Sequence, residues 1–284
     1  MEQGKLIIGS QTGLAKVIPS IEKIAATSTP VLIVGEIGTG RNFFANEVHL
    51  SSQFQNGPFV KLFCKGGQVS SHAIEEAFSN AKGGSLFLDD VGELDQMPQK
   101  KLLDLLRQNR HPNVRVVASS DYRLYEYVGT GKFLQDLFYE LHIAKVVLPP
   151  LRERLVDIPH FLCHFLRTYN QMMHRQVKIS EGAIRYLRKY SWPGNIRELE
   201  NMVQSMVSQS APDHCILEGE LSHFLPQRNI SSPKSVFEEV REQRRQKYRQ
   251  LLLQAEGNVS LAARNLGVPR TTFRRHLKKL GLTG

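Results

Sequence analysis

The sequence predicts a three-layer α/β sandwich around a parallel sheet, followed by helical segments only. Over the first 150 residues, short apolar runs alternate with stretches of helical periodicity, which is typical of parallel strands covered by helices. Strand patterns stop after Pro149 and Pro150, and helical patterns continue to the end of the chain. We therefore expect an α/β body, a helical subdomain and a separate all-α C-terminal domain.

Composition limits the class of protein. The chain has 284 residues, of which 41% are hydrophobic and 23% charged, as in ordinary globular proteins. No apolar run approaches the roughly 20 residues of a membrane helix, and the first residues do not form a signal peptide, so we expect a cytoplasmic protein without a membrane partner. Cys64, Cys163 and Cys215 lie too far apart for a metal knuckle, and the histidine spacing predicts no metal site.

The strands of the body are predicted from short continuous apolar runs, which are typical of buried parallel strands. They lie at residues 30–34, 85–90, 113–120 and 144–148, with a helix at 98–108 between the second and third. Helical periodicity then covers residues 158–173, 180–189 and 195–208, and the polar stretch PQRNISSP follows. The predicted domains are an α/β subdomain (1–150), a helical lid (151–225), a linker (226–234) and a C-terminal domain (235–284).

A glycine-rich loop, GEIGTGRN, occupies residues 35–42. It follows the first apolar run and leads into a predicted helix. Glycines let backbone amides point inward and the helix N-terminus adds positive charge, so such a loop can bind phosphate. Its spacing is that of Walker A, but Arg41 stands at the lysine position and Asn42 at the Ser/Thr position. The alternative is a tight turn that needs glycine for geometry alone. The predicted binding residues are Gly35, Glu36, Gly38, Thr39, Gly40, Arg41 and Asn42.

Two acids end the second apolar run, in the sequence SLFLDDVG, and this pattern resembles Walker B. Asp89 would hold Mg²⁺ through water, and the second acid would polarise the attacking water. Asp90 is one methylene shorter than the glutamate suited to that second task. The alternative is an acidic strand end in solvent.

Four motifs together resemble the AAA+ domain of bacterial enhancer-binding proteins, the activators of sigma-54 RNA polymerase. They are PVLIVGE with GTG (30–40), AKGGSLFLD (81–89), LPPLRER with Asp157 and Ile158, and the sensor II motif WPGNIRELEN (192–201). The resemblance covers about residues 8–225. It implies an AAA+ P-loop sandwich with a helical lid and Arg197 as the sensor II residue of the nucleotide site. No cofactor is predicted with certainty, and ATP with Mg²⁺ is the candidate.

The chain departs from that family at the residues used for hydrolysis and coupling. Only 18 residues separate Cys64 from Gly83, and no GAFTGA loop lies between them. The two trans-acting arginine positions hold Leu134 and Glu140, and the sensor I asparagine is replaced by Asp121. An arginine finger is worth about 10³–10⁵ in rate. Together with the Walker changes, these departures predict a domain that neither hydrolyses ATP at a useful rate nor remodels a sigma-54 holoenzyme.

The C-terminal fifth carries most of the charge: residues 234–284 hold 12 Lys and Arg against 4 Asp and Glu. Such concentration predicts a polyanionic partner. Residues 258–281 read as helix, turn at Gly267, helix, and resemble the Fis-type helix-turn-helix. Leu261, Ala262 and Leu266 are the predicted apolar face of the first helix. The predicted apolar stripe of the second helix consists of Phe273, Leu277 and Leu280. The predicted DNA contacts are Arg270, Thr271, Thr272, Arg274, Arg275 and Lys278. The alternative is a solvated basic hairpin.

A helix from Ser235, opened by a capping-box pattern, to about residue 255 carries apolar residues Phe237, Val240, Tyr248, Leu251, Leu252 and Leu253. In Fis-type domains the corresponding helices pair two subunits, which implies a homodimer or higher homo-oligomer on pseudo-palindromic double-stranded DNA. The leading hypothesis is a sequence-specific, sigma-54-independent transcription regulator without ATP turnover, with RNA polymerase as a further candidate partner. The alternatives are a weak ATPase that remodels another target and a nucleotide-sensing regulator in which Arg41 holds a phosphate ligand.

Overall fold

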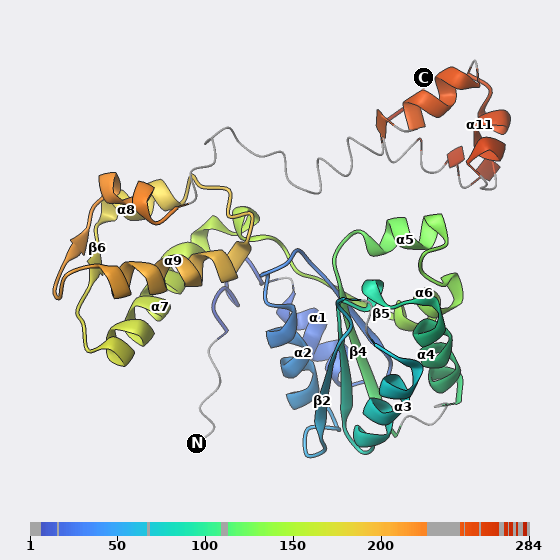
Figure 1. Cartoon of the computed structure of the whole chain (residues 1–284), viewed down its shortest axis with the longest axis horizontal. Helices are drawn as coiled ribbons and strands as arrows, with labels where there is room; N and C mark the ends of the chain where they lie inside the picture. Colours follow the sequence, from blue (N-terminus) through green and yellow to red (C-terminus); the bar gives the residue numbers. More distant parts are fainter. Residues whose placement is uncertain are drawn as a thin grey trace. The chain divides into compact units, whose positions relative to one another are not determined.

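The computed structural model describes residues 7–15, 17–66, 69–108, 113–225, 245–246, 248–255, 257–266, 270–271, 273–274, 277 and 281–282. The chain forms two compact units, residues 1–228 and 229–284, which are treated separately below (Figure 1). Within the described part, no helix combines the length and the apolar character needed to cross a membrane.

A five-stranded parallel sheet organises the first unit, in the order β2-β3-β4-β1-β5. Its strands are β1 (Val31–Val34), β2 (Phe59–Phe63), β3 (Ser85–Asp89), β4 (Arg115–Ser120) and β5 (Ala144–Val147). The four predicted strands are confirmed. Strand β2 was missed because it is an edge strand, exposed along part of its length and interrupted by Lys61, so it lacks a continuous apolar run.

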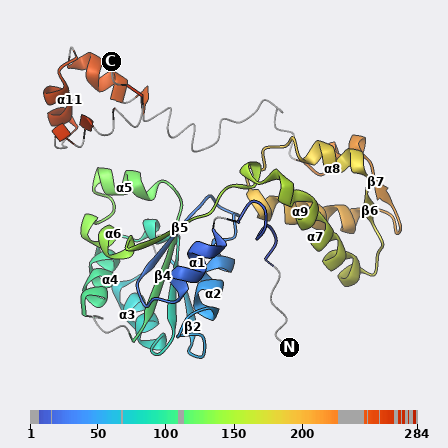
Figure 2. The ribbon, with the colours of Figure 1, turned by 180° about the vertical axis from the view of Figure 1, so that it is seen from behind.

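Helices cover both faces of this sheet, so the predicted three-layer α/β sandwich is confirmed (Figure 2). Val31 and Ile33 of β1 pack toward α1 (Ile18–Ala25) and α2 (Arg41–Leu50), whereas the alternate residues Leu32 and Val34 face the opposite layer. That layer contains α3 (Ser71–Asn80), α4 (Gln96–Gln108), α5 (Leu124–Thr130) and α6 (Gln135–Leu141). A short 3-10 helix, η1 (Val91–Glu93), follows β3.

The lid packs around its own apolar core, with Trp192 fully buried and its indole Nε1 donating to the Leu187 carbonyl at 2.9 Å. Its helices are η2 (Leu151–Glu153), η3 (Leu155–Asp157), α7 (Ile158–Met173), α8 (Glu181–Leu187), α9 (Asn195–Gln209) and η4 (Glu218–His223). The expectation that strands end at residue 150 was wrong. Strands β6 (Lys178–Ile179) and β7 (Cys215–Ile216) pair in parallel, but two residues are too short for a periodic signal.

In the second unit, α11 (Val259–Asn265) begins at Asn258, whose side-chain Oδ1 accepts from the amides of Ser260 and Leu261 at 3.0 and 3.2 Å. The described residues share a small core in which the rings of Tyr248 and Phe273 stack with centroids 4.9 Å apart. One position predicted on the apolar face of the first helix was wrong, since Leu261 is 42% exposed. In α11, Ala262 and Ala263 are buried, and Leu266 packs beside them.

The predicted stripe on the second helix is confirmed where it is described: Phe273 and Leu277 are buried in the same core. Leu280, the capping-box residues Ser235 and Glu238, and the apolar residues Phe237 and Val240 lie outside the described residues.

Candidate nucleotide-binding site

The glycine-rich loop lies between β1 and the start of α2, at the carboxyl edge of the sheet. Gly38 and Gly40 both have left-handed backbone, with φ of +83° and +102°. A Cβ added to Gly38 would lie 2.2 Å from the carbonyl oxygen of Gly194, whereas one added to Gly40 would meet only ordinary contacts beyond 3.7 Å. Glycine is therefore required twice over at position 38, by conformation and by the close approach of the lid.

Asn195 joins the loop to the lid. Its side chain is fully buried, donates from Nδ2 to the Ile37 carbonyl at 3.0 Å and to Glu36 Oε2 at 3.3 Å, and accepts the Leu151 amide at 2.8 Å. The next amide, of Ile196, donates to the Gly38 carbonyl at 3.0 Å. The start of α9 thus satisfies the backbone of the loop directly.

Glu36 also belongs to this junction. Its carboxylate accepts two hydrogen bonds from the Arg152 guanidinium, at 2.7 and 2.6 Å. Bonding to this carboxylate is the main cause that raises the pKa of Arg152. With both oxygens engaged by the protein, Glu36 acts as a connector between the loop and the lid.

The two acids at the end of β3 are held by Ser119 of β4. Its Oγ donates to Asp89 Oδ1 at 2.5 Å and accepts the amide of Asp90 at 3.1 Å. Asp90 has left-handed backbone, with φ of 56°. Neighbouring strands of one parallel sheet therefore fix the Asp89 carboxylate and the Asp90 backbone at the same edge.

Arg41 turns toward these acids. Its Nη2 lies 2.6 Å from Asp90 Oδ1 and 3.9 Å from Asp89 Oδ1, and its side chain is 8% exposed. The other guanidinium nitrogen, Nη1, and the Asn42 Oδ1 atom are buried without a hydrogen-bond partner. Burial is the main cause that raises the pKa of Asp90, and the nearby Arg41 charge opposes that rise.

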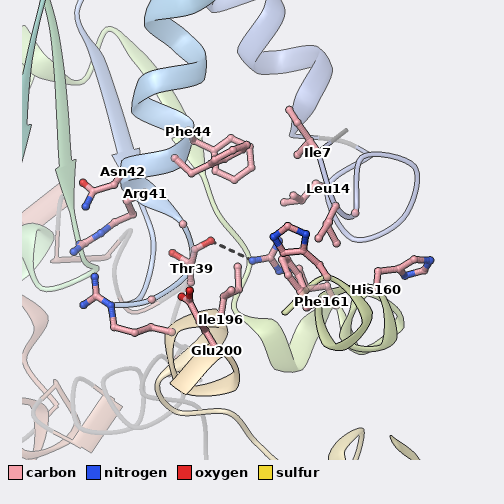
Figure 3. A pocket seen from close by; sticks show the side chains of 18 of the residues that line it. Ile7, Leu14, Thr39, Arg41, Asn42, Phe44, His160, Phe161, Ile196 and Glu200 are labelled. Carbon is pink, nitrogen blue, oxygen red and sulfur yellow. Dashed lines mark hydrogen bonds between the residues drawn. The ribbon is translucent and has the colours of Figure 1, made fainter. Parts of the chain in front are cut away.

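A cavity of about 1190 Å³ opens beside the loop (Figure 3). Its apolar wall includes Ile7, Leu14, Phe44, Phe161 and Ile196, contributed by the N-terminal segment, α2, α7 and α9. The phosphate-loop residues form the polar end. Apolar walls beside a few convergent polar groups are typical of small-molecule sites.

Most of the predicted binding residues meet at this cavity: Gly38, Thr39, Gly40, Arg41, Asn42, Asp89, Asp90 and Arg197 line it. Gly35 and Glu36, which were also predicted as binding residues, are not among its lining residues. Gly35 lies beside Thr39 and Leu148, and Glu36 is held by Arg152 and Asn195.

Sequence reasoning gave no role to two residues of the linking segment, Arg154 and Asp157. Arg154 is buried and donates from Nη2 to the Thr39 carbonyl at 3.1 Å, the dashed contact in Figure 3. Burial lowers its pKa to about 10. Asp157 accepts from the Thr12 hydroxyl and approaches Gly9 closely, so it fixes the N-terminal wall of the cavity. The motif LPPLRER with Asp157 was the available signal.

The residues at the expected finger and sensor I positions make local contacts. Leu134 packs against the sheet core and its amide donates to Gln99 Oε1 at 2.7 Å. Glu140 lies 3.9 Å from Arg107, and Asp121 pairs with Arg123 at 2.7 Å. On the second unit, Arg270, Thr271 and Arg274 are helical and exposed. Thr272, Arg275 and Lys278 lie outside the described residues.

Family comparisons assign three consecutive parts of the chain. Residues 8–151 match the sigma-54 interaction domain, 152–236 the AAA+ ATPase lid domain, and 249–280 the Fis family of bacterial regulatory proteins. The phenol regulator MopR of Acinetobacter guillouiae is 34% identical, with 97% of this chain and 56% of MopR covered. The acetoin dehydrogenase operon transcriptional activator AcoR of Bacillus subtilis is 31% identical, with 98% and 51% covered. The chain spans about half the length of such relatives.

Among solved structures, NtrX from Brucella abortus in complex with ADP superposes with a TM-score of 0.70 at 26% identity, covering 97% of this chain and 69% of NtrX. The RuvB branch-migration motor of Thermotoga maritima shares the fold alone, with a TM-score of 0.54 at 16% identity. The domain matches and the fold agree. The chain belongs to the family of bacterial regulators that join an AAA+ sigma-54 interaction domain and its lid to a Fis-type helix-turn-helix domain.

Proposed function

We propose that this chain is a DNA-binding transcription regulator that acts without sigma-54 and without sustained ATP hydrolysis, and whose AAA+ body is a nucleotide-binding and self-associating platform. The observation that carries the proposal is the ion pair between Arg41 and Asp90, at 2.6 Å. It joins the two positions that hydrolysis needs most, the Walker A cation and the second Walker B acid.

Loss of turnover follows from what these two groups do. A residue that positions the attacking water needs a free carboxylate, and Asp90 already gives one oxygen to Arg41. The finger positions carry Leu134 and Glu140, so a neighbouring subunit of the same chain supplies no arginine there. Each of these changes removes stabilisation of an anionic transition state.

Independence from sigma-54 is supported by the short segment between β2 and β3. Described residues 71–80 form the single ten-residue helix α3, whose N-cap Ser70 accepts the amide of Ala73 at 3.1 Å. No GAFTGA sequence occurs in the chain. The GAFTGA residues, which couple ATP hydrolysis to sigma-54 in this family, are therefore missing.

DNA binding is supported by the Fis-family match at residues 249–280 and by the excess of basic residues there. Arg270, Thr271 and Arg274 are helical and exposed, as contacts to a DNA groove require. Relatives that bear the names of a transcriptional activator and a phenol regulator fit the same role.

Fluorescence anisotropy with duplex DNA tests the proposed DNA binding. The intact chain should prefer particular sequences, and binding should weaken steeply between 50 and 200 mM salt (a range that costs about 10³–10⁵ for six to ten phosphate contacts). Replacing Arg270 and Arg274 by Ala should weaken binding and make the salt slope shallower by about one for each lost phosphate contact. Arg185→Ala, on the exposed face of the lid, is the matched control. Absence of salt-sensitive, sequence-preferring binding would overturn the proposal.

Hydrolysis assays test the other part. Phosphate release by the intact chain should stay at background with ATP and Mg²⁺, with and without DNA. A variant that restores the family residues, Arg41→Lys with Leu134→Arg and Glu140→Arg, should gain activity if only these groups are missing. Clear turnover by the unmodified chain would instead favour the weak ATPase.

A nucleotide-sensing regulator is the second candidate, and the cavity beside the loop favours it. Gly38, Gly40, Arg41 and Arg197 all line that cavity, and the similar NtrX was solved with ADP. Calorimetric titration with a panel of adenine and guanine nucleotides tests this candidate. Binding of one of them supports a nucleotide sensor, and absence of binding contradicts it.

A further inference from the structure

We propose that the cavity binds the phosphates of a nucleotide without a divalent cation, with the Arg41 guanidinium in the place that Mg²⁺ has in other P-loop proteins, between phosphate and the Walker B carboxylates. The inference rests on the proposed nucleotide-binding function of the same site and adds how that site neutralises its ligand.

The residues present do not fit Mg²⁺. This ion takes six oxygen ligands in near-octahedral geometry, and P-loop proteins supply them from a Ser or Thr hydroxyl and a Walker B carboxylate. Asn42 at the hydroxyl position still offers an amide oxygen, but the carboxylates already hold a cation, because a guanidinium nitrogen lies 2.6 Å from Asp90 and 3.9 Å from Asp89. A second cation at these carboxylates would be repelled by the first.

The carboxylates are held for this pairing. Ser119 binds Asp89 Oδ1 and the backbone amide of Asp90, so the Asp89 carboxylate and the Asp90 backbone are fixed beside each other. Their side chains are 14% and 20% exposed, and that of Arg41 is 8% exposed. In such a poorly solvated place an ion pair is screened little by salt.

Arg41 keeps a donor for a ligand. Its Nη2 binds Asp90, while Nη1 is buried, has no hydrogen-bond partner and belongs to a side chain that lines the cavity. A guanidinium is planar and can hydrogen-bond through two edges at once, and it matches phosphate geometry well. One side chain therefore bridges a carboxylate and a phosphate oxygen, the same pair that a metal ion would bridge.

The charge of the cavity fits a metal-free polyphosphate. Five Lys or Arg side chains and three Asp or Glu side chains line it, so the protein itself supplies a net positive charge. Arg154, Arg167 and Arg197 are among the five. A nucleotide without bound Mg²⁺ carries more negative charge than its magnesium complex, and it matches this lining better.

The experiment is calorimetric titration of the intact chain with ADP and with ATP, in 5 mM MgCl₂ and in EDTA. We expect dissociation constants that agree within about twofold between the two conditions. Weakening by about tenfold or more in EDTA would overturn this inference while leaving nucleotide binding in place. Absence of binding in both conditions would overturn the nucleotide-binding proposal together with it.

Arg41→Lys tests the role of the guanidinium. A lysine ammonium is a point charge that cannot bridge in the same way, so binding in EDTA should weaken by about tenfold, and Mg²⁺ should restore part of the loss. Arg185→Lys, outside the cavity, makes the same chemical change and should alter neither value. A thermal unfolding scan of each variant checks that the fold is retained. Binding by Arg41→Lys that equals that of the unmodified chain in EDTA would also overturn the inference.

Discussion

Residues 35–39 and 40–42 belong to one phosphate-binding loop, yet different partners hold the two parts. The first part is bonded to the lid: Asn195 and Arg152 engage Glu36, and the Ile196 amide reaches the Gly38 carbonyl. The second part faces the strand ends, where Arg41 pairs with Asp90. The lid side holds the loop through Glu36 and backbone groups, whereas the strand side holds it through the Arg41 side chain.

This difference separates architecture from chemistry within a single loop. The lid side combines the Glu36–Arg152 ion pair with backbone groups and the fully buried Asn195 side chain, so a changed residue there leaves buried groups unsatisfied. The strand side depends on a few charged side chains, and one ion pair can replace another arrangement without disturbing the sheet. A domain can therefore keep the AAA+ fold while its catalytic positions change.

Gly38→Ala should have the largest effect on stability. The new Cβ would lie 2.2 Å from the Gly194 carbonyl on left-handed backbone, so we expect a loss of about 3–5 kcal/mol in the free energy of unfolding. Gly40→Ala shares the left-handed backbone but makes only ordinary van der Waals contacts, and should cost only about 1–2 kcal/mol. Urea unfolding of both variants measures the contrast. Equal losses in the free energy of unfolding would mean that the close approach of Gly194 to Gly38 adds nothing to the cost of the Gly38 substitution.

Asn195→Ala comes next. It leaves the Leu151 amide and the Ile37 carbonyl buried without their partner, so a loss of about 2–4 kcal/mol is expected. The matched control is Asn201→Ala, on the exposed face of the same helix, which should stay within about 0.5 kcal/mol of the unmodified chain. If the two variants unfold at the same urea concentration, the Asn195 contacts with the loop contribute little to the stability of the chain.

The strand side should respond more weakly. Arg41→Met leaves Asp90 without its ion-pair partner beside Asp89. Because the acids are only partly exposed, the free energy of unfolding should fall by about 1–3 kcal/mol. Adding Asp90→Asn removes that unpaired charge, so the double variant should recover most of the loss. Chemical denaturation of both single variants and the double variant gives the coupling energy. Strictly additive losses would contradict an ion pair.

The smallest expected effect lies away from the loop and concerns pH. His49 on α2 is buried against Ser85, with its Nδ1 2.9 Å from the serine Oγ, and its pKa is lowered mainly by burial and further by Arg115. The unfolded chain therefore binds the proton more readily, and this part of the stability is complete above pH 6.5 and lost as the pH falls below it. His49→Gln should flatten the fall in melting temperature between pH 7 and 5. An unchanged slope would assign that fall to other groups.

Sequence reasoning located the site well where the signal was local. The buried strands, the long lid helices and most cavity-lining residues of the loop were predicted, because burial on both faces and glycine spacing leave clear patterns. It missed β2, which is half exposed, and the two-residue strands β6 and β7. The contact of Glu36 with Arg152 was not predicted either, since nothing near position 36 shows that Arg152 lies opposite.

The amino-acid sequence by itself determined the fold class, the family and the glycine-rich loop that follows the first strand. These depend on residue type and spacing along the chain. Only the tertiary structure decided which partners those residues find. Arg41 meets Asp90, and Asn195 meets Ile37, across 49 and 158 positions. Such pairs form because parallel strand ends and the start of a lid helix converge at one edge of a sheet, and no local pattern encodes that convergence.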